Sequence, residues 1–292
     1  MNDYPVIDTW CNLFTPASMK KNYRDTPEMA YVFDLWRMTD RLRGWTTEEF
    51  AQVLDASGVS MAFIPVWQSR SWKTQSMLWD MDIEEVAEVM RADPARYKGM
   101  FGINPYHRME GVRALERAIT QHGFSCAHLH HYGYNLRPDD KAFFPFYAKC
   151  VELDVPVMIQ MGHSAEFMPS EVGRPIYLDE IALYFPTLRI IAAHTGWPWV
   201  EELIAMAWKH PNVYISTTAH SPRYWDKSLV HFLNSRGKGK VMYGTDFPVV
   251  THAQSLAEID ALGLKPEARK ALLHDTAVKV FRLAPSPVTA AR

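Results

Sequence analysis

The sequence predicts an α/β fold in which eight parallel strands and their helices close into a (β/α)8 TIM barrel. Short apolar runs rich in Val, Ile and aromatic residues alternate with segments of helical periodicity along the whole chain. Such alternation is typical of parallel strands joined by right-handed crossovers. Eight units within 292 residues also match the usual size of a barrel, about 250 residues.

The elements follow from this pattern in chain order. The predicted strands are 6–10, 61–66, 97–103, 127–131, 157–161, 189–194, 213–217 and 241–246. The predicted helices are 48–56, 83–91, 112–120, 144–153, 178–184, 200–207 and 227–234, with 256–262 and 271–280 after the last strand. Thr46 with Glu49, and Asp82 with its following acids, indicate helix starts.

One domain, 1–284, and a short C-terminal tail, 285–292, account for the chain. Two insertions, at 12–45 and 69–81, follow the first and second strands and are longer than a strand-to-helix loop needs. An open doubly wound sheet is the alternative fold. It is less favoured because the glycine-rich nucleotide-binding turns of such sheets are missing.

Composition excludes several classes of function. With 31 Lys and Arg against 33 Asp and Glu, the net charge is −2, so neither a nucleic-acid footprint nor a polybasic membrane patch is expected. Three cysteines are too few for a disulfide framework. The start of the sequence has no signal-peptide pattern. We therefore expect a cytoplasmic protein that does not bind membranes.

Reactive groups of a barrel lie where its strands end. This position selects Asp246 and His194 as catalytic candidates, with His163 and His220 as further ones. His128 and His130 share one face of their strand, and His130 is the stronger candidate for substrate binding. A histidine at a strand end can also simply donate to a backbone carbonyl, and this reading stays open for each of them.

Tryptophan is unusually frequent, with ten in the chain. Six of these fall at or just past strand ends, and aromatic walls favour flat, apolar ligands: Trp10, Trp67, Trp72, Trp197, Trp199 and Trp225. Arginines in the same loops could hold a carboxylate in a bidentate fork: Arg70, Arg137, Arg174 and Arg223. The expected substrate-binding set is Trp10, Asn12, Trp67, Arg70, His130, Tyr132, Gln160 and Trp197.

Four strand-end motifs carry a family resemblance. They are Val-Ile-Asp-x-Trp-x-Asn at 6–12, Pro-Val-Met-Ile-Gln at 156–160, Ile-Ile-Ala-Ala-His-Thr-Gly at 190–196 and Tyr-Gly-Thr-Asp-Phe-Pro at 243–248. The chain resembles the amidohydrolase-related branch of the amidohydrolase superfamily, which includes aminocarboxymuconate-semialdehyde decarboxylase. The resemblance implies a TIM barrel, a role in the breakdown of aromatic compounds and a homodimer or other homo-oligomer.

The same resemblance implies a metal centre that this chain has largely lost. Trp10, Asn12 and Gln160 stand where the family places metal-binding histidines, whereas His194 and Asp246 are kept. An indole has no ligating atom, and a catalytic zinc needs three protein ligands. We therefore expect no cofactor. The alternative is one divalent ion such as zinc, held by His194, Asp246 and His130.

The expected function is that of a hydrolase or lyase. It would hydrolyse, hydrate or decarboxylate a small aromatic or cyclic carboxylic acid, with Asp246 and His194 as acid and base. Two alternatives stay open. The chain could be a catalytically inactive, ligand-binding relative, or a metal-dependent hydrolase with a rearranged site.

Overall fold

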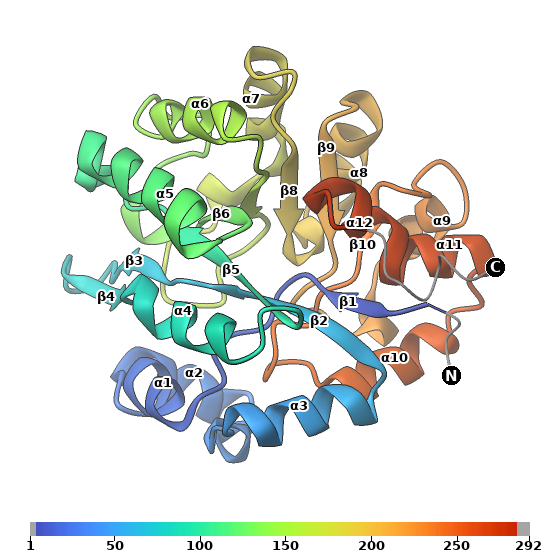
Figure 1. Cartoon of the computed structure of the whole chain (residues 1–292). Coiled ribbons are helices and arrows are strands. Elements are labelled where there is room, and N and C mark those ends of the chain that lie inside the picture. Colours follow the sequence, from blue (N-terminus) through green and yellow to red (C-terminus); the bar gives the residue numbers. More distant parts are fainter. Residues whose placement is uncertain (1–3, 285–292) are drawn as a thin grey trace.

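The computed structural model describes residues 4–284 and contains a curled sheet of eight parallel strands surrounded by helices (Figure 1). The spatial order of the strands follows the chain. They are β1 Val6–Asp8, β2 Val59–Pro65, β5 Tyr97–Gly102, β6 Cys126–Leu129, β7 Val157–Gln160, β8 Ile190–Ala193, β9 Val213–Ser216 and β10 Val241–Met242. Each predicted strand is present, so the predicted barrel is confirmed.

The first and last strands close the sheet into a barrel. Cys11 forms a parallel bridge with Phe247 just beyond the ends of β1 and β10. The Thr9 N–H donates to the Tyr243 carbonyl at 3.0 Å, and the Asp246 N–H donates to the Trp10 carbonyl at 2.9 Å. These bonds bring the ends of β1 and β10 together, which places their side chains at one mouth of the barrel.

Helices pack around the outside of the sheet (Figure 1). Those that follow strands are α4 Ile83–Ala92, α5 Arg108–His122, α6 Phe144–Glu152, α7 Leu178–Tyr184, α8 Val200–Lys209, α9 Lys227–Leu233 and α10 His252–Asp260, with α3 Thr47–Ala56 between β1 and β2. The predicted capping box at Thr46 and Glu49 is present. The helix predicted at 256–262 starts earlier, because the Thr251 hydroxyl caps α10 by accepting from the Gln254 N–H.

The core lies between the sheet and this ring of helices. Strands β6 to β10 are buried along their whole length, which explains their continuous apolar sequences. After α10, the segment 266–281 forms α11 Pro266–Lys270, a π-helical turn at Ala271–Asp275 and α12 Thr276–Phe281. The Leu272 carbonyl of the π-helical turn accepts a hydrogen bond from the Tyr243 N–H, just after β10.

Both predicted insertions form structure of their own. The first contains α1 Pro16–Met19, a π-helical turn at Lys20–Arg24, α2 Pro27–Leu35 and a 3-10 turn at Thr39–Leu42. The second forms an antiparallel hairpin of β3 Gln68–Arg70 and β4 Met77–Asp80. Within residues 4–284, no helix is long and apolar enough to cross a membrane. The predicted tail at 285–292 lies outside the described residues.

Candidate active site

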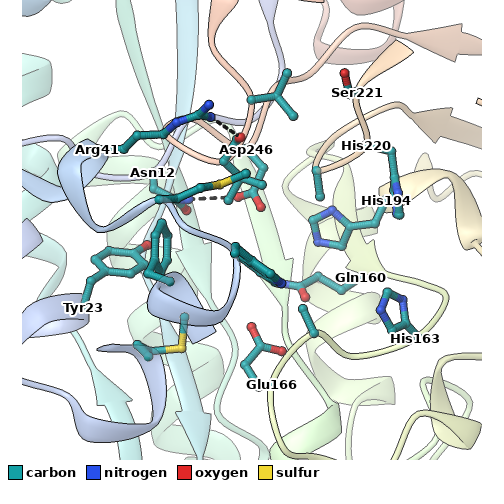
Figure 2. Close-up of a pocket in the computed structure, with 18 of the residues that line it drawn as sticks. Asn12, Tyr23, Arg41, Gln160, His163, Glu166, His194, His220, Ser221 and Asp246 are labelled. Atoms are coloured by element: carbon teal, nitrogen blue, oxygen red, sulfur yellow. Dashed lines mark hydrogen bonds between the residues drawn. The ribbon is translucent and has the colours of Figure 1, made fainter. Parts of the chain in front are cut away.

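A cavity of about 600 Å³ opens beyond the carboxyl ends of the strands. Figure 2 shows that its polar side chains come from several strand ends and converge on one space. They are Asn12 after β1, Gln160 at the end of β7, His163 and Glu166 in the next loop, His194 after β8, His220 after β9 and Asp246 after β10. The cavity thus occupies the place where barrels position reactive groups.

Much of the remaining wall is aromatic, and further polar side chains of the lining are Arg41, Ser221, Arg223 and Gln254. The first insertion supplies Tyr23, Met29, Phe33, Trp36 and Met38. The hairpin region adds Trp67 and Trp79. An aromatic wall was predicted, but Trp67 is the only one of the six proposed tryptophans in the lining of this cavity. A flat, ring-shaped or conjugated ligand fits such a wall best.

Two indoles fix the side-chain amide of Asn12. The Trp10 Nε1–H donates to Asn12 Oδ1 at 3.2 Å, and the Trp67 Nε1–H donates to the same oxygen at 3.1 Å. Because an indole only donates, the amide oxygen must face both rings. The amide nitrogen therefore points the other way and donates to Asp246 Oδ1 at 2.9 Å (Figure 2).

Asp246 is half-buried at the centre of the site. Removal from water raises the pKa of its carboxyl group well above the ordinary value, and the negative charge of Glu166 acts in the same direction. The Asn12 amide and the Trp10 indole oppose this shift. The net effect favours a protonated Asp246, whose Oδ2 is the oxygen left to carry the proton.

His194 is held as a neutral ring. Thr218 Oγ1 accepts from the His194 backbone N–H at 3.0 Å and lies 2.7 Å from Nδ1. We assign the hydroxyl hydrogen to Nδ1, which leaves the His194 proton on Nε2. Burial lowers the pKa of His194 to about 3, and nearby His220 contributes to this. The ring is therefore a neutral hydrogen-bond donor around neutral pH.

The two further predicted histidines also line the cavity. Burial lowers the pKa of His220 to about 4. Burial likewise lowers the pKa of His163, whose ring packs edge-on against Trp197 at 4.7 Å between centroids. The structure thus brings together all four predicted catalytic side chains and, of the predicted substrate-binding set, Asn12, Gln160 and Trp67.

Five other predicted substrate-binding residues lie outside this lining. Trp10, His130 and Tyr132 are buried behind it. Arg70 donates to the Gln75 carbonyl and lies over the Tyr106 ring, and 48% of Trp197 is exposed. The structure does not bring these five side chains into the cavity lining, and their role in substrate binding stays a prediction.

Glu166 and Arg41 are the two charged residues that sequence reasoning missed. The Glu166 carboxylate points into the cavity from the loop after β7 (Figure 2). Arg41 Nη1 donates to the Val249 carbonyl at 2.7 Å and to the Pro248 carbonyl at 3.3 Å. Among residues 4–284, Arg41 makes no ion pair with an acidic side chain. The only sequence signal that could have pointed to Arg41 is its place in the first insertion, which follows a strand and therefore lies at the mouth of the barrel.

The residues present do not fit the metal centre of the resembled family. Asn12 Oδ1 is taken by two indole donors, and the Gln160 amide nitrogen lies 3.4 Å from His128 Nε2. No group of three His, Cys, Asp or Glu side chains within 4–284 is placed to hold an ion. His130 lies behind the wall, so it does not complete a site with His194 and Asp246.

Known proteins resemble this chain in sequence and in structure. It is 33% identical over 138 residues to 2-keto-4-carboxy-3-hexenedioate hydratase from Sphingobium sp., and this alignment spans 38% of this chain and 38% of that protein. An uncharacterised TIM-barrel protein from Bordetella bronchiseptica superposes with a TM-score of 0.78 at 22% identity, covering 96% of this chain and 99% of that one.

A 5-carboxyvanillate decarboxylase from Novosphingobium aromaticivorans, complexed with manganese, superposes with a TM-score of 0.71 at 19% identity, covering 96% of each chain. These structural likenesses establish the fold. The amidohydrolase family model matches residues 7–283, which is nearly the whole chain. The chain therefore belongs to the amidohydrolase family and is an enzyme of that family.

Proposed function

We propose that this enzyme is a lyase or hydrolase that acts on a small aromatic or cyclic carboxylic acid by acid–base chemistry, without a metal ion. The observation that carries this proposal is the pairing of Asp246 and His194 in one aromatic cavity, where Asn12 donates to Asp246 Oδ1 at 2.9 Å. Asn12 stands at a position where the resembled family has a metal ligand, and here it makes hydrogen bonds instead.

Asp246 supplies the proton. Its raised pKa keeps the carboxyl group protonated over a wider pH range, and a positioned acid of this kind typically accelerates proton transfer about 10²–10⁴-fold. Asn12 holds Oδ1, so Oδ2 delivers the proton to a substrate carbon or oxygen. His194, neutral and protonated on Nε2, donates to the oxygen on which negative charge develops.

Arg41 binds the substrate carboxylate. Its guanidinium lines the cavity beside the segment that follows Asp246, and Nη1 is anchored on two backbone carbonyls. With no acidic partner among residues 4–284, the remaining N–H groups are available for a bidentate contact with an anion. The aromatic wall then encloses the ring or conjugated part of the same molecule.

The names of the relatives support this choice of substrate. The Sphingobium relative is named as a hydratase of an unsaturated carboxylic acid, and the Novosphingobium structure is that of a decarboxylase of an aromatic acid. Either reaction places a proton on carbon, which is the step assigned to Asp246. A cytoplasmic location and homo-oligomeric assembly belong to the same proposal, supported by the resemblance and by three free, buried cysteines.

The test is the isosteric variant Asp246→Asn. Wild-type enzyme and variant are incubated with 5-carboxyvanillate and with 2-keto-4-carboxy-3-hexenedioate, and products are measured by mass spectrometry. Loss of carbon dioxide, or gain of water, identifies the reaction. We expect D246N to lower kcat/KM by about 100-fold or more, whereas Asp25→Asn, on the exposed surface, leaves it unchanged. Full turnover by D246N contradicts the mechanism, and ligand binding without product by the wild type favours the inactive alternative.

A further inference from the structure

We propose that Glu166 is a second catalytic carboxylate, which removes a proton from the water that this enzyme adds to an unsaturated carboxylic acid. This inference rests on the proposed function and makes it more specific. It assigns the reaction to hydration of an activated carbon–carbon double bond. It is argued from the position of Glu166, from the side chains that hold Glu166 in place and from the proton that Asp246 supplies on another side of the cavity.

Glu166 and Asp246 approach the cavity from different sides of the barrel. Glu166 follows β7 and Asp246 follows β10, and the sheet order places β8 and β9 between those strands. Figure 2 shows Glu166 and Asp246 apart from each other in the cavity, with Gln160 and His194 to one side of them. A substrate in the cavity therefore meets one carboxyl group on each side.

The Glu166 carboxylate is fixed through one oxygen only. The Ser164 hydroxyl donates to Oε2 at 2.6 Å, and His130 Nε2 lies 3.7 Å from the same oxygen. The other oxygen, Oε1, accepts no hydrogen bond among the described residues. The Glu166 side chain is 11% exposed, and that exposed part lines the cavity. Oε1 is thus the oxygen available to a bound water.

His130 is positioned for this support. Its ring is fully buried, and Nδ1 lies 2.7 Å from Ser69 Oγ at the hairpin. Within residues 4–284, His130 Nε2 is buried and has no hydrogen-bond partner at normal distance. The acidic group beside it is the Glu166 carboxylate, which a protonated Nε2 would stabilise. His130 is therefore a positioning residue that acts through Glu166, which gives a function to a histidine predicted to contact substrate directly.

The two carboxyl groups have opposite tendencies. Burial acts to raise the pKa of Glu166, but His130 and Ser164 overcome this and lower it to about 2. Burial raises the pKa of Asp246. Environments that separate two pKa values in this way assign one group as base and the other as acid. Together with their positions on different sides of the barrel, this makes Glu166 the base and Asp246 the acid of the proposal.

The addition balances with water as the only co-reactant. A water molecule forms a bond from its oxygen to one alkene carbon, and Glu166 Oε1 takes one of the water protons. The π-electron pair moves to the neighbouring carbon, which takes the proton of Asp246. Glu166 ends protonated and Asp246 ionised, and exchange with solvent restores both. Decarboxylation needs only the proton donor, and an ionised Glu166 would have no part in it.

The test follows oxygen from solvent into product. The enzyme is incubated with 2-keto-4-carboxy-3-hexenedioate and with cis,cis-muconate in water enriched in heavy oxygen. We expect a product that carries one solvent oxygen in a new hydroxyl group. Glu166→Gln should lower kcat by about 100-fold with KM changed little, and Ser164→Ala should lower kcat less. Glu171→Gln, an exposed acid of the same loop, is the matched control and should behave as the wild type.

Three results would overturn this assignment: no labelled product from either acid, a product that has only lost carbon dioxide, or an E166Q variant that keeps wild-type kcat. Circular dichroism of E166Q establishes that its fold is intact. The two proposals fail separately. If D246N is inactive and E166Q is fully active, Asp246 keeps its role and the assignment of Glu166 is wrong.

Discussion

Asn12 shows how a single amide can take over a position that the resembled family uses for a metal ligand. Its oxygen accepts from Trp10 and Trp67, and its nitrogen donates to Asp246. Since each indole N–H can only donate, the two rings decide which end of the amide meets the carboxyl group. Trp67 therefore acts on Asp246 through Asn12, whereas Trp10 acts both through Asn12 and directly.

Trp67→Phe tests this arrangement. The variant removes one donor to Asn12 Oδ1 and keeps an aromatic ring, so the amide turns more freely and donates less to Asp246. That donation lowers the pKa of Asp246, so its loss raises the pKa. The catalytic acid must be protonated, and kcat falls as pH rises through this pKa. We expect the falling limb to move to higher pH by about half a unit to one unit, since a hydrogen bond contributes about 1 kcal/mol.

The measurement is kcat against pH for wild type and W67F. Trp208→Phe, an exposed tryptophan on α8, is the control and should leave the profile unchanged. A W67F profile that superposes on the wild type, or moves to lower pH, would show that Trp67 does not orient the amide.

Residues at strand ends could be predicted, and residues in loops could not. Counting along β8 and the segment after β10 places His194 and Asp246 at the mouth of the barrel, because side chains alternate and strand ends share one edge. Glu166 and Arg41 come from segments with no such period. Their direction is decided by contacts with Ser164 and with the Val249 carbonyl, which the sequence pattern does not encode.

At the scale of elements, Asp8 joins β1 to the segment after β10 and to α10. Its buried carboxylate accepts from the Thr245 N–H at 3.0 Å, from the Thr245 hydroxyl at 2.6 Å and from the Trp10 N–H at 3.0 Å. His252 Nε2 on α10 lies 2.8 Å from Oδ2. This one side chain thus holds the closing seam of the barrel directly below Asp246.

Asp8→Asn should destabilise the fold strongly. The amide nitrogen cannot accept, so one or more of these buried donors loses its partner. Leaving a buried hydrogen-bond donor without its partner typically costs about 1–3 kcal/mol. We expect a loss of that order in the free energy of unfolding, measured by urea denaturation. Asp25→Asn, at an exposed carboxylate, is the control. A D8N variant as stable as the wild type would show that Asp8 does not hold the seam.

The strands and outer helices followed from periodicity, whereas the β3–β4 hairpin did not. Gln68–Arg70 has none of the alternation typical of a strand, and it pairs with β4 through bonds of its own turn, such as that from the Ser71 N–H to the Ser76 carbonyl. Gly133 explains why the hairpin packs so closely against the loop after β6. A Cβ there would lie 2.0 Å from the Arg70 carbonyl oxygen, so the fit depends on the neighbouring loop.

At the scale of the whole molecule, eight repeated units predict a closed barrel, but the insertions decide what the barrel does. The first insertion supplies Arg41 and much of the aromatic wall, and the hairpin region supplies Trp67 and Trp79. Both insertions follow strands, so both cover the same mouth. The predicted self-association stays a prediction, which sedimentation velocity of the full chain would test.

Metal independence is the property in which this molecule should differ most from the manganese-containing decarboxylase that shares its fold. At the three positions where the resembled family has histidines, the chain has an indole that cannot ligate and two amides engaged with neighbouring side chains. The kept pair, His194 and Asp246, is one ligand short of a catalytic zinc site.

We expect protein purified without chelator to contain less than about 0.1 equivalent of any divalent transition metal, and kcat/KM to stay within about twofold after dialysis against EDTA. Elemental analysis and activity assays on the same sample provide the measurement. Stoichiometric zinc or manganese, with activity that chelation removes and the ion restores, would show that other groups complete the site and that the indole–amide network is not its replacement.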